Sequence, residues 1–280
     1  MAKASIVITT YNRPELLKRA IRSVLNQEFD DYEIIVVNDG GGYAEENPFI
    51  SKVSWIDHNK NKGLSAARNT GIKAAKGEYI VCLDDDNELL PNFLKDTIEE
   101  IGSYDAITGQ RIIQYKDIAE VAMPKLSRFT SVDQAWLIKK SVFDEIMYDE
   151  ELRANEDADF GIRFFKKFGA RVLDKPVCVV YDTENSLSFP DERELKGIEL
   201  FLKKNLKEYD DPDELRYLYR LVGRKYYRGG HRLKGLHYFW KSFLADKNQK
   251  SFLHFIIILL FGWTVYDKFM SYIEKIRATP

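Results

Sequence analysis

Three consecutive carboxylates stand in the N-terminal half of the chain, where Asp84, Asp85 and Asp86 follow the apolar residues 79–83 and precede Asn87. Adjacent like charges repel one another, so a folded protein keeps such a run on solvent or beside a counter-charge. Carboxylate oxygens at the end of a strand suit Mg²⁺ or Mn²⁺ that carries a diphosphate. A solvated acidic turn is the alternative interpretation, and the run alone does not decide between the two.

The segments around this run predict an α/β sheet, because β-prone apolar segments alternate with segments of helical spacing. The predicted strands are residues 5–10, 34–37, 53–56, 79–83, 106–115 (one long strand or a pair), 134–139 and 171–181. The predicted helices begin at Pro14, at Ser65 as the N-cap, near Pro91, at Ser141 and within the acidic stretch 150–160. Residues 116–130 give no clear pattern and are compatible with a substrate-facing loop.

Four polar segments are predicted to meet at one edge of this sheet, because each ends a strand or opens a helix there. They are residues 9–14, 38–42, 61–69 and 84–87. The carboxyl-end edge of a parallel sheet is the usual place for a ligand crevice. The coincidence of all four segments at one edge favours a nucleotide-diphosphate site over four unrelated turns.

Each of these segments offers a group that a nucleotide needs. Tyr11 offers a flat apolar face for a base, Asp39 an acceptor for a base N–H, and residues 40–42 are glycines that allow close backbone approach. Arg68 offers a planar cation for ribose or phosphate oxygens. Taken singly, Tyr11 is also compatible with packing at a strand end, Asp39 with an ordinary turn, and Arg68 with a solvated position on a helix.

This ordered set of segments resembles the family 2 inverting glycosyltransferases with the GT-A fold. The resemblance rests on residues 5–14, 37–40, 61–69 with Gly71, 83–86, and 155–160 with Arg163. It covers roughly residues 4–188. It implies an α/β domain of the GT-A (Rossmann-like) type, with α/β/α layers and a mixed central sheet.

The same resemblance implies where a nucleotide-diphosphate sugar and a divalent metal bind. The residues assigned to the donor are Thr9, Tyr11, Arg13, Asp39 and Arg68, together with Asp84 and Asp85 near the ribose and phosphates. Asp86 matches the ligand of Mn²⁺ or Mg²⁺, with Asp84 second, because the family motif is often Asp-x-Asp. Many members complete the metal site with a histidine, but the matching stretch here has none, so the third ligand is Asp182 or is absent.

The acidic stretch 150–160 acquires a role from this resemblance. In an inverting transfer one carboxylate takes the proton of the acceptor hydroxyl. Asp157 matches the family's base, and Glu156 beside it is the second catalytic candidate. Glu156 and Asp159 are expected to position the acceptor or to bind Arg163. A helix start rich in acids for the helix dipole is the alternative interpretation, and both can hold.

Composition places these motifs in a protein with a modest net charge. The chain has 280 residues, 45% of them hydrophobic, and a net charge of -2, which by itself implies no polyanionic partner. Residues 191–280 hold 18 basic and 12 acidic side chains, which leaves 24 and 32 for residues 1–190. Cys82 and Cys178 lie in apolar segments, so buried thiols are favoured over a disulfide or a metal site. With no secretory signal pattern, we expect a cytoplasmic protein.

The pattern changes to helices alone beyond about residue 190. We therefore predict a donor-binding and catalytic domain over residues 1–188 and a helical extension over residues 189–280. Residues 216–280 hold 13 basic and 3 acidic side chains, and residues 252–263 are apolar nearly all round. This segment is shorter than the ~20 residues that span a bilayer, so it suits an interfacial helix at the inner, anionic face of the cell membrane. A core helix is the alternative, and nucleic-acid binding is disfavoured.

These inferences predict a metal-dependent inverting glycosyltransferase. It would move a sugar from a nucleotide-diphosphate donor, with UDP-sugars favoured, to a hydroxyl of a saccharide or lipid-linked acceptor in bacterial surface polysaccharide synthesis. The alternative is a non-catalytic nucleotide-sugar-binding protein on a degenerate GT-A fold. A sugar-1-phosphate nucleotidyltransferase is disfavoured, because residues 10–14 do not form a glycine-rich phosphate loop after the first strand.

Overall fold

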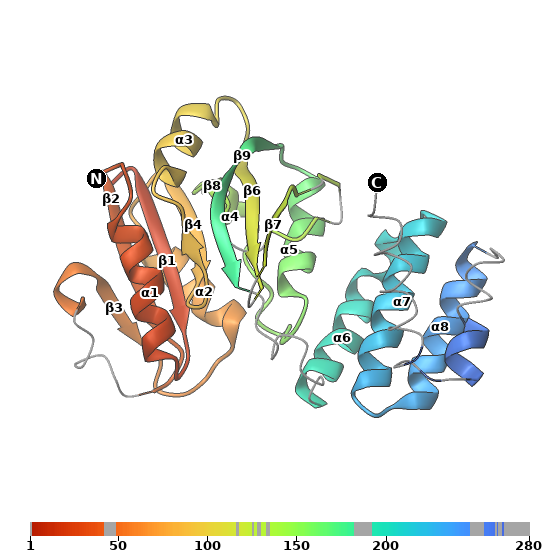
Figure 1. Ribbon diagram of the computed structural model, residues 1–280. Helices are drawn as coiled ribbons and strands as arrows, with labels where there is room; N and C mark the ends of the chain where they lie inside the picture. Colours follow the sequence, from red (N-terminus) through yellow and green to blue (C-terminus); the bar gives the residue numbers. More distant parts are fainter. Residues whose placement is uncertain are drawn as a thin grey trace. The chain divides into compact units, whose positions relative to one another are not determined.

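The computed structural model divides the chain into two compact units, Met1–Ser186 and Leu187–Pro280, beside the boundary predicted from the sequence. The residues that the structure describes are 2–41, 49–115, 118–124, 126–127, 130–132, 135–181, 192–246, 255–260, 262 and 265. Figure 1 shows the elements of each unit along the chain.

The first unit is built on one mixed sheet (Figure 1). Among the described residues its strands are β1 Ala4–Thr10, β2 Tyr32–Asn38, β3 Ser54–Asp57, β4 Tyr79–Asp84, β5 Glu88–Leu89, β6 Ala106–Gln114, β7 Ala119–Ala122, β8 Leu137–Lys139 and β9 Ala170–Tyr181. Their order is β3-β2-β1-β4-β8-β6-β9-β5, with β7 paired to β6. The first four strands of this order are parallel, whereas β8 is antiparallel to both of its neighbours. The carboxyl ends of β1, β2 and β4 therefore lie at one edge.

Helices cover both faces of this sheet. They are α1 Pro14–Leu25, α2 Leu64–Ala74, α3 Phe93–Glu100, α4 Val142–Glu145 and α5 Glu156–Phe165, with a short 3₁₀ turn, η1, at Ile50–Lys52. Alternate residues of β1 point to opposite faces, so Ile6 and Ile8 pack with α1 and α3, while Val7 packs with α2, α4 and α5. The α/β/α layering predicted from the sequence is confirmed.

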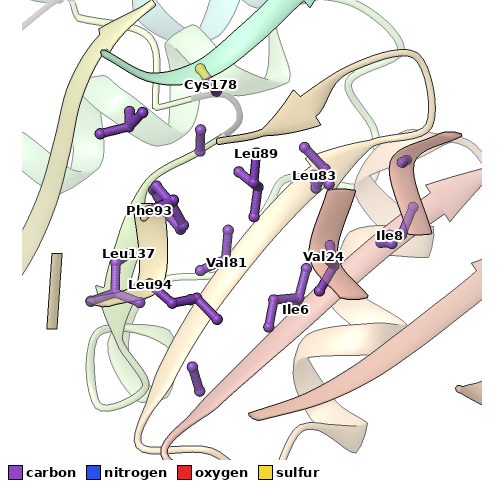
Figure 2. Packing of buried hydrophobic residues seen from close by; sticks show 14 of the residues in the cluster. Ile6, Ile8, Val24, Val81, Leu83, Leu89, Phe93, Leu94, Leu137 and Cys178 are labelled. Atoms are coloured by element: carbon purple, nitrogen blue, oxygen red, sulfur yellow. The ribbon is translucent and has the colours of Figure 1, made fainter. Parts of the chain in front are cut away.

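Figure 2 shows the packing on the α1–α3 face. The labelled members of this cluster are Ile6, Ile8, Val24, Val81, Leu83, Leu89, Phe93, Leu94, Leu137 and Cys178. Cys82 and Cys178 are both buried, as predicted, and burial raises the pKa of the Cys82 thiol to about 11. The apolar residues before the aspartates therefore form a strand that is buried on both faces, and Asp84 stands at its carboxyl end.

One local prediction, the start of helix α2, differs from the structure. Helix α2 begins after Gly63, which has a φ of 98°, rather than after a Ser65 N-cap. Ser65 is buried instead, and its hydroxyl donates to the carbonyl of Leu152 at 3.4 Å. Of the two alternatives for residues 106–115, the structure has the single long strand, β6 Ala106–Gln114, and part of the unassigned stretch 116–130 is the strand β7 that pairs with it.

The second unit is helical in its described residues. It contains α6 Glu192–Asn205, the 3₁₀ turn η2 Leu206–Glu208, α7 Pro212–Arg228 and α8 Arg232–Asp246, followed by helical residues 255–260. Helices α7 and α8 approach closely at glycines: a Cβ added to Gly235 would lie 3.0 Å from the carbonyl of Gly223. The rings of Tyr226 and Tyr238 stack across the same contact, with centroids 5.4 Å apart. No helix in the described part of the chain is long and apolar enough to cross a membrane.

Candidate active site

A cleft of about 390 Å³ opens at the carboxyl ends of β1, β2 and β4. Its lining comes from all four segments that the sequence predicted to meet. The lining residues are Thr9, Thr10, Tyr11, Arg13, Asp39, Asn61, Gly63, Leu64, Ala67, Asp84, Asp85 and Asp86. The ring of Tyr11 is 48% exposed, so a flat apolar surface remains available at the wall of the cleft.

Asp39 is held at this wall by three hydrogen bonds. Its Oδ1 accepts from the backbone N–H of Lys62 at 2.8 Å, and its Oδ2 accepts from the N–H of Gly63 at 2.7 Å. The Nδ1 of His58 lies 2.7 Å from the same Oδ1. A carboxylate only accepts hydrogen bonds, so His58 must donate from Nδ1. Asp39 is thereby fixed in one orientation in a buried position.

His58 is a positioning residue for Asp39, and no motif in its sequence surroundings indicates this role. Its imidazole is buried, and its Nε2 lies 3.0 Å from the hydroxyl of Thr70 on α2. Gly40 contributes to the same packing, because a Cβ there would lie 2.9 Å from the backbone nitrogen of Asn61. Gly40 therefore allows a close approach to the protein's own backbone. Gly42 lies outside the described residues.

The three aspartates are divided between two arginines: Asp85 and Asp86 share Arg13, whereas Asp84 binds Arg68. Asp85 is buried, and it accepts hydrogen bonds from the Thr10 hydroxyl at 2.7 Å and from Arg13 at 3.3 Å. Burial raises the pKa of the Asp85 carboxyl to about 6, although both partners work against this rise. Asp86 accepts from the same guanidinium nitrogen of Arg13 at 3.2 Å. Burial, followed by the charge of Asp84, raises the pKa of Asp86 as well.

These carboxylates fit a divalent cation only together with a ligand that supplies further oxygens. In the described part of the chain, no three side chains of histidine, cysteine, aspartate or glutamate converge as a metal cage. Nucleotide-bound Mg²⁺ commonly takes one or two carboxylates and completes its shell with phosphate oxygens and water. Asp84 and Asp86 line the cleft and can provide those two, and a nearby positive charge would offset the repulsion that raises the pKa of Asp86. Asp182 lies outside the described residues.

Arg68 lies behind the cleft wall, with two carboxylates as its partners. Its guanidinium is almost fully buried and does not line the cleft. One nitrogen donates to Asp84 at 2.9 Å and another donates to Glu156 at 3.0 Å. Burial acts against the charge, but the two carboxylates hold the pKa of Arg68 well above its ordinary value. Arg68 is therefore not a solvated helix residue: it is a buried counter-charge that ties β4 to the start of α5.

The acidic first turn of α5 lies beside the cleft through this connection. Glu156, Asp157 and Asp159 all fall in that turn, where carboxylates are favoured by the helix dipole. Asp159 binds Arg163 at 2.6 Å, as expected, whereas Glu156 is committed to Arg68. Neither Glu156 nor Asp157 is part of the cleft lining itself.

Asn69 anchors the loop that leads into α5. Its amide nitrogen donates to the carbonyl of Tyr148 at 2.9 Å, and its amide oxygen accepts from the N–H of Tyr148 at 3.0 Å. The ring of Tyr148 in turn lies under the Arg68 guanidinium, 5.1 Å from its centroid. Asn69 was part of the sequence motif but received no role, because its partner lies 79 residues away.

The raised pKa of Asp85 predicts a pH-dependent stability difference. Because the folded state binds this proton more tightly than the unfolded state, the contribution of Asp85 to stability is complete below its ordinary pKa of 3.8 and is lost as pH rises through about 6. The Asp85→Asn side chain cannot ionise. We therefore expect the free energy of unfolding of this variant to exceed that of the wild type by about 2–3 kcal/mol at about pH 8, and to equal it near pH 4. Urea denaturation at both pH values measures the difference. An exposed Asp144→Asn variant serves as the control; a gain at Asp85 that grew toward low pH would contradict the prediction.

The fold and its cleft define the class of protein. Crystal structures of S. aureus TarS resemble this chain with a TM-score of 0.61 at 15% identity, covering 89% of this chain and 50% of TarS. A structure of TarS residues 1–349 in complex with UDP-GlcNAc gives a TM-score of 0.56 at 17% identity, covering 86% of this chain and 73% of that one. At these identities the likeness shows the fold, which is the GT-A fold of glycosyltransferases.

The model of the family described as "Glycosyl transferase family 2" matches residues 5–172, and the chain belongs to this family. Uncharacterized glycosyltransferase EpsJ of Bacillus subtilis is 28% identical over 66% of this chain and 62% of its own length. The poly(ribitol-phosphate) beta-N-acetylglucosaminyltransferase TarP of Staphylococcus aureus is 30% identical over 66% of this chain and 65% of its own. A GalNAc(5)-diNAcBac-PP-undecaprenol beta-1,3-glucosyltransferase of Campylobacter jejuni is 27% identical over 60% and 61%. The chain thus spans somewhat under two thirds of these relatives.

Proposed function

We propose that this protein is a metal-dependent inverting glycosyltransferase that uses a UDP-sugar. Its acceptor would be a hydroxyl of a saccharide or of a lipid-linked oligosaccharide in bacterial surface polysaccharide synthesis. The observation that carries the proposal is the cleft itself, in which Tyr11, Asp39 and the three aspartates line one cavity. Relatives named for transfer to poly(ribitol-phosphate) and to an undecaprenol-linked saccharide support the acceptor class.

The hydrogen bonds of Asp39 favour uracil as the base. A carboxylate has about four acceptor positions, and three of those on Asp39 are occupied by His58, Lys62 and Gly63. The remaining position suits a base that presents a ring N–H, as uracil and guanine do, and disfavours cytosine and adenine, which present a lone pair there. A solved structure with the same fold in complex with UDP supports uracil.

The aspartates at the end of β4 would serve the leaving diphosphate. Asp86 and Asp84 would hold Mg²⁺ or Mn²⁺, which supplies Lewis-acid stabilisation of the charge that develops on the leaving group. Arg13 adds a second positive charge at the same rim, because it contacts both Asp85 and Asp86. The cation and Arg13 would therefore compensate the carboxylates and the diphosphate together.

Asp157 would act on the acceptor. In the displacement, the acceptor oxygen forms the new bond to the anomeric carbon while the bond from that carbon to the diphosphate oxygen breaks. The acceptor proton passes to the carboxylate of Asp157, on the face opposite the leaving group. Arg68 would act as a positioning residue, because it ties Glu156, the neighbour of this base, to Asp84 at the donor side.

A screen of nucleotide sugars by thermal shift tests the donor proposal. A ligand that binds the folded chain alone raises its Tm by mass action. With Mn²⁺ present, we expect UDP-sugars to raise the Tm more than GDP-sugars, and ADP- and CDP-sugars to have little effect, because the last two offer no ring N–H to Asp39. Equal shifts with all four nucleotides, or the largest with CDP-sugars, would refute the assignment of Asp39.

We further propose a cytoplasmic location with peripheral contact to the inner face of the cell membrane through the C-terminal helices. The support is the excess of basic side chains in residues 216–280, where 13 lysines and arginines accompany 3 acidic residues. A lipid-linked acceptor would require such contact, since its sugar end lies at the bilayer surface. Of the apolar segment 252–263, the structure describes residues 255–260 and 262.

A further inference from the structure

One face of helix α8 carries large apolar side chains that are open to solvent. Leu233 is 84% exposed, Trp240 is 39% exposed and Leu244 is 46% exposed. Residues three, four or seven positions apart lie on the same side of a helix, so these three form one stripe, with the exposed His237 between them. The opposite side of α8 is buried at Gly235 and Phe239, against α7.

The helical residues 255–260 enlarge this stripe. The ring of Phe255 lies against that of Trp240, with centroids 5.3 Å apart. Leu259 is one helical turn beyond Phe255 and is 49% exposed, and its neighbour Leu260 is 67% exposed. We call the set Leu233, Trp240, Leu244 and Leu259 the α8 apolar patch. Contiguous exposed apolar surface of this kind marks a site of contact with a protein or a membrane.

Basic side chains border the α8 apolar patch. Arg232 and Lys234 flank Leu233 in the sequence, and both are exposed. Lys241 lies beside the patch on α8, with its ammonium over the rings of Tyr219 and Tyr238 at 5.7 and 5.4 Å. No acidic residue occurs between Arg216 and Ala245. Positively charged side chains thus lie on the borders of the apolar stripe.

We propose that the α8 apolar patch docks on the surface of an anionic phospholipid bilayer. Apolar and aromatic side chains would enter the acyl boundary, while the flanking lysine and arginine side chains bind the headgroups. A second copy of the chain fits less well, because a two-fold contact would bring the same basic border face to face with itself. The α8 apolar patch would thus be the surface through which the proposed membrane contact is made. This assignment rests on the proposed function only in that a lipid-linked acceptor gives the docking its use.

Sedimentation of the full chain with vesicles tests this assignment. With vesicles of equal parts phosphatidylcholine and phosphatidylglycerol, we expect the wild type to sediment, and a Leu233→Ser, Leu244→Ser double variant to lose affinity about tenfold or more. Vesicles of phosphatidylcholine alone should retain little of either protein. Val121→Ser, which changes a 61% exposed residue of β7 in the first unit, is the matched control and should sediment like the wild type.

Equal sedimentation of the wild type and the double variant would overturn the proposal, and so would equal sedimentation with the two kinds of vesicle. A third contrary outcome is a wild-type chain that elutes as a dimer in size-exclusion chromatography while the double variant elutes as a monomer. The same proteins are tested for the Tm shift caused by a UDP-sugar. Vesicle binding without that shift would refute the proposed donor alone. A normal shift in the double variant shows that the substituted chain is folded.

Discussion

Replacing Asp157 with asparagine is expected to slow sugar transfer about a thousandfold, within the 10²–10⁴ range that a positioned general base contributes. The amide keeps the shape of the side chain but cannot accept the acceptor proton. Binding of the UDP-sugar should change little, because Asp157 is not part of the cleft lining. The measurement is UDP release from the donor that stabilises the chain most, in the presence of saccharide and lipid-linked acceptors.

The control for this variant is Asp144→Asn, an exposed carboxylate on α4 that also leaves the cleft lining intact. Full transfer activity in Asp157→Asn would remove Asp157 from the mechanism. A wild-type chain that binds UDP-sugars but releases no UDP with any acceptor would favour the alternative of a non-catalytic binding protein.

Replacing Arg68 with methionine is expected to destabilise the fold by about 3 kcal/mol, the lower part of the range for breaking a buried ion pair by removing one partner. The substitution leaves Glu156, whose side chain is 12% exposed, without its counter-charge. Asp84 is 28% exposed and can regain some hydration, which limits the loss. Urea denaturation at neutral pH measures the free energy of unfolding.

Lys73→Met on the exposed side of the same helix provides the comparison, and it should stay within about 0.5 kcal/mol of the wild type. Arg68→Lys should lie between the two, because an ammonium keeps the charge but lacks the fork that reaches both carboxylates. A loss in Arg68→Met no greater than that in Lys73→Met would mean that the ion pairs contribute nothing to the link between β4 and α5.

The sheet was predictable because the local residue pattern of its strands is enough to identify them. The segments 5–10, 34–37 and 79–83 reappear as β1, β2 and β4, since strands buried on both faces read as continuous apolar runs. Segment 53–56 reappears as β3, a half-exposed strand at the end of the sheet. The cleft followed from topology, because parallel strands bring their carboxyl ends to one edge. Tyr11, Asp39 and the aspartates therefore meet where they were expected.

The contacts that could not be predicted are those between residues distant in the sequence. Arg68 was predicted to bind the donor, and its sequence surroundings do not show that its guanidinium donates to Asp84 and to Glu156, which lies 88 residues away. His58 gave no local signal, because its partner Asp39 is 19 residues earlier and belongs to another strand end. Ser65 is a residue type that is common at the N-cap, yet Gly63 occupies the N-cap and the helix begins at Leu64. Local pattern could not show any of these three contacts.

The most direct test of the donor cleft is the Tm shift that UDP and Mn²⁺ cause together, compared between the wild type and Asp86→Ala. We predict a clear rise for the wild type, a smaller rise when EDTA replaces Mn²⁺, and no difference between Mn²⁺ and EDTA for Asp86→Ala. Asp86 lines the cleft and is partly exposed, so its loss should not by itself unfold the chain. A rise in Asp86→Ala that still depended on Mn²⁺ to the wild-type extent would contradict the proposed metal ligand, and no rise in the wild type would contradict the proposed donor.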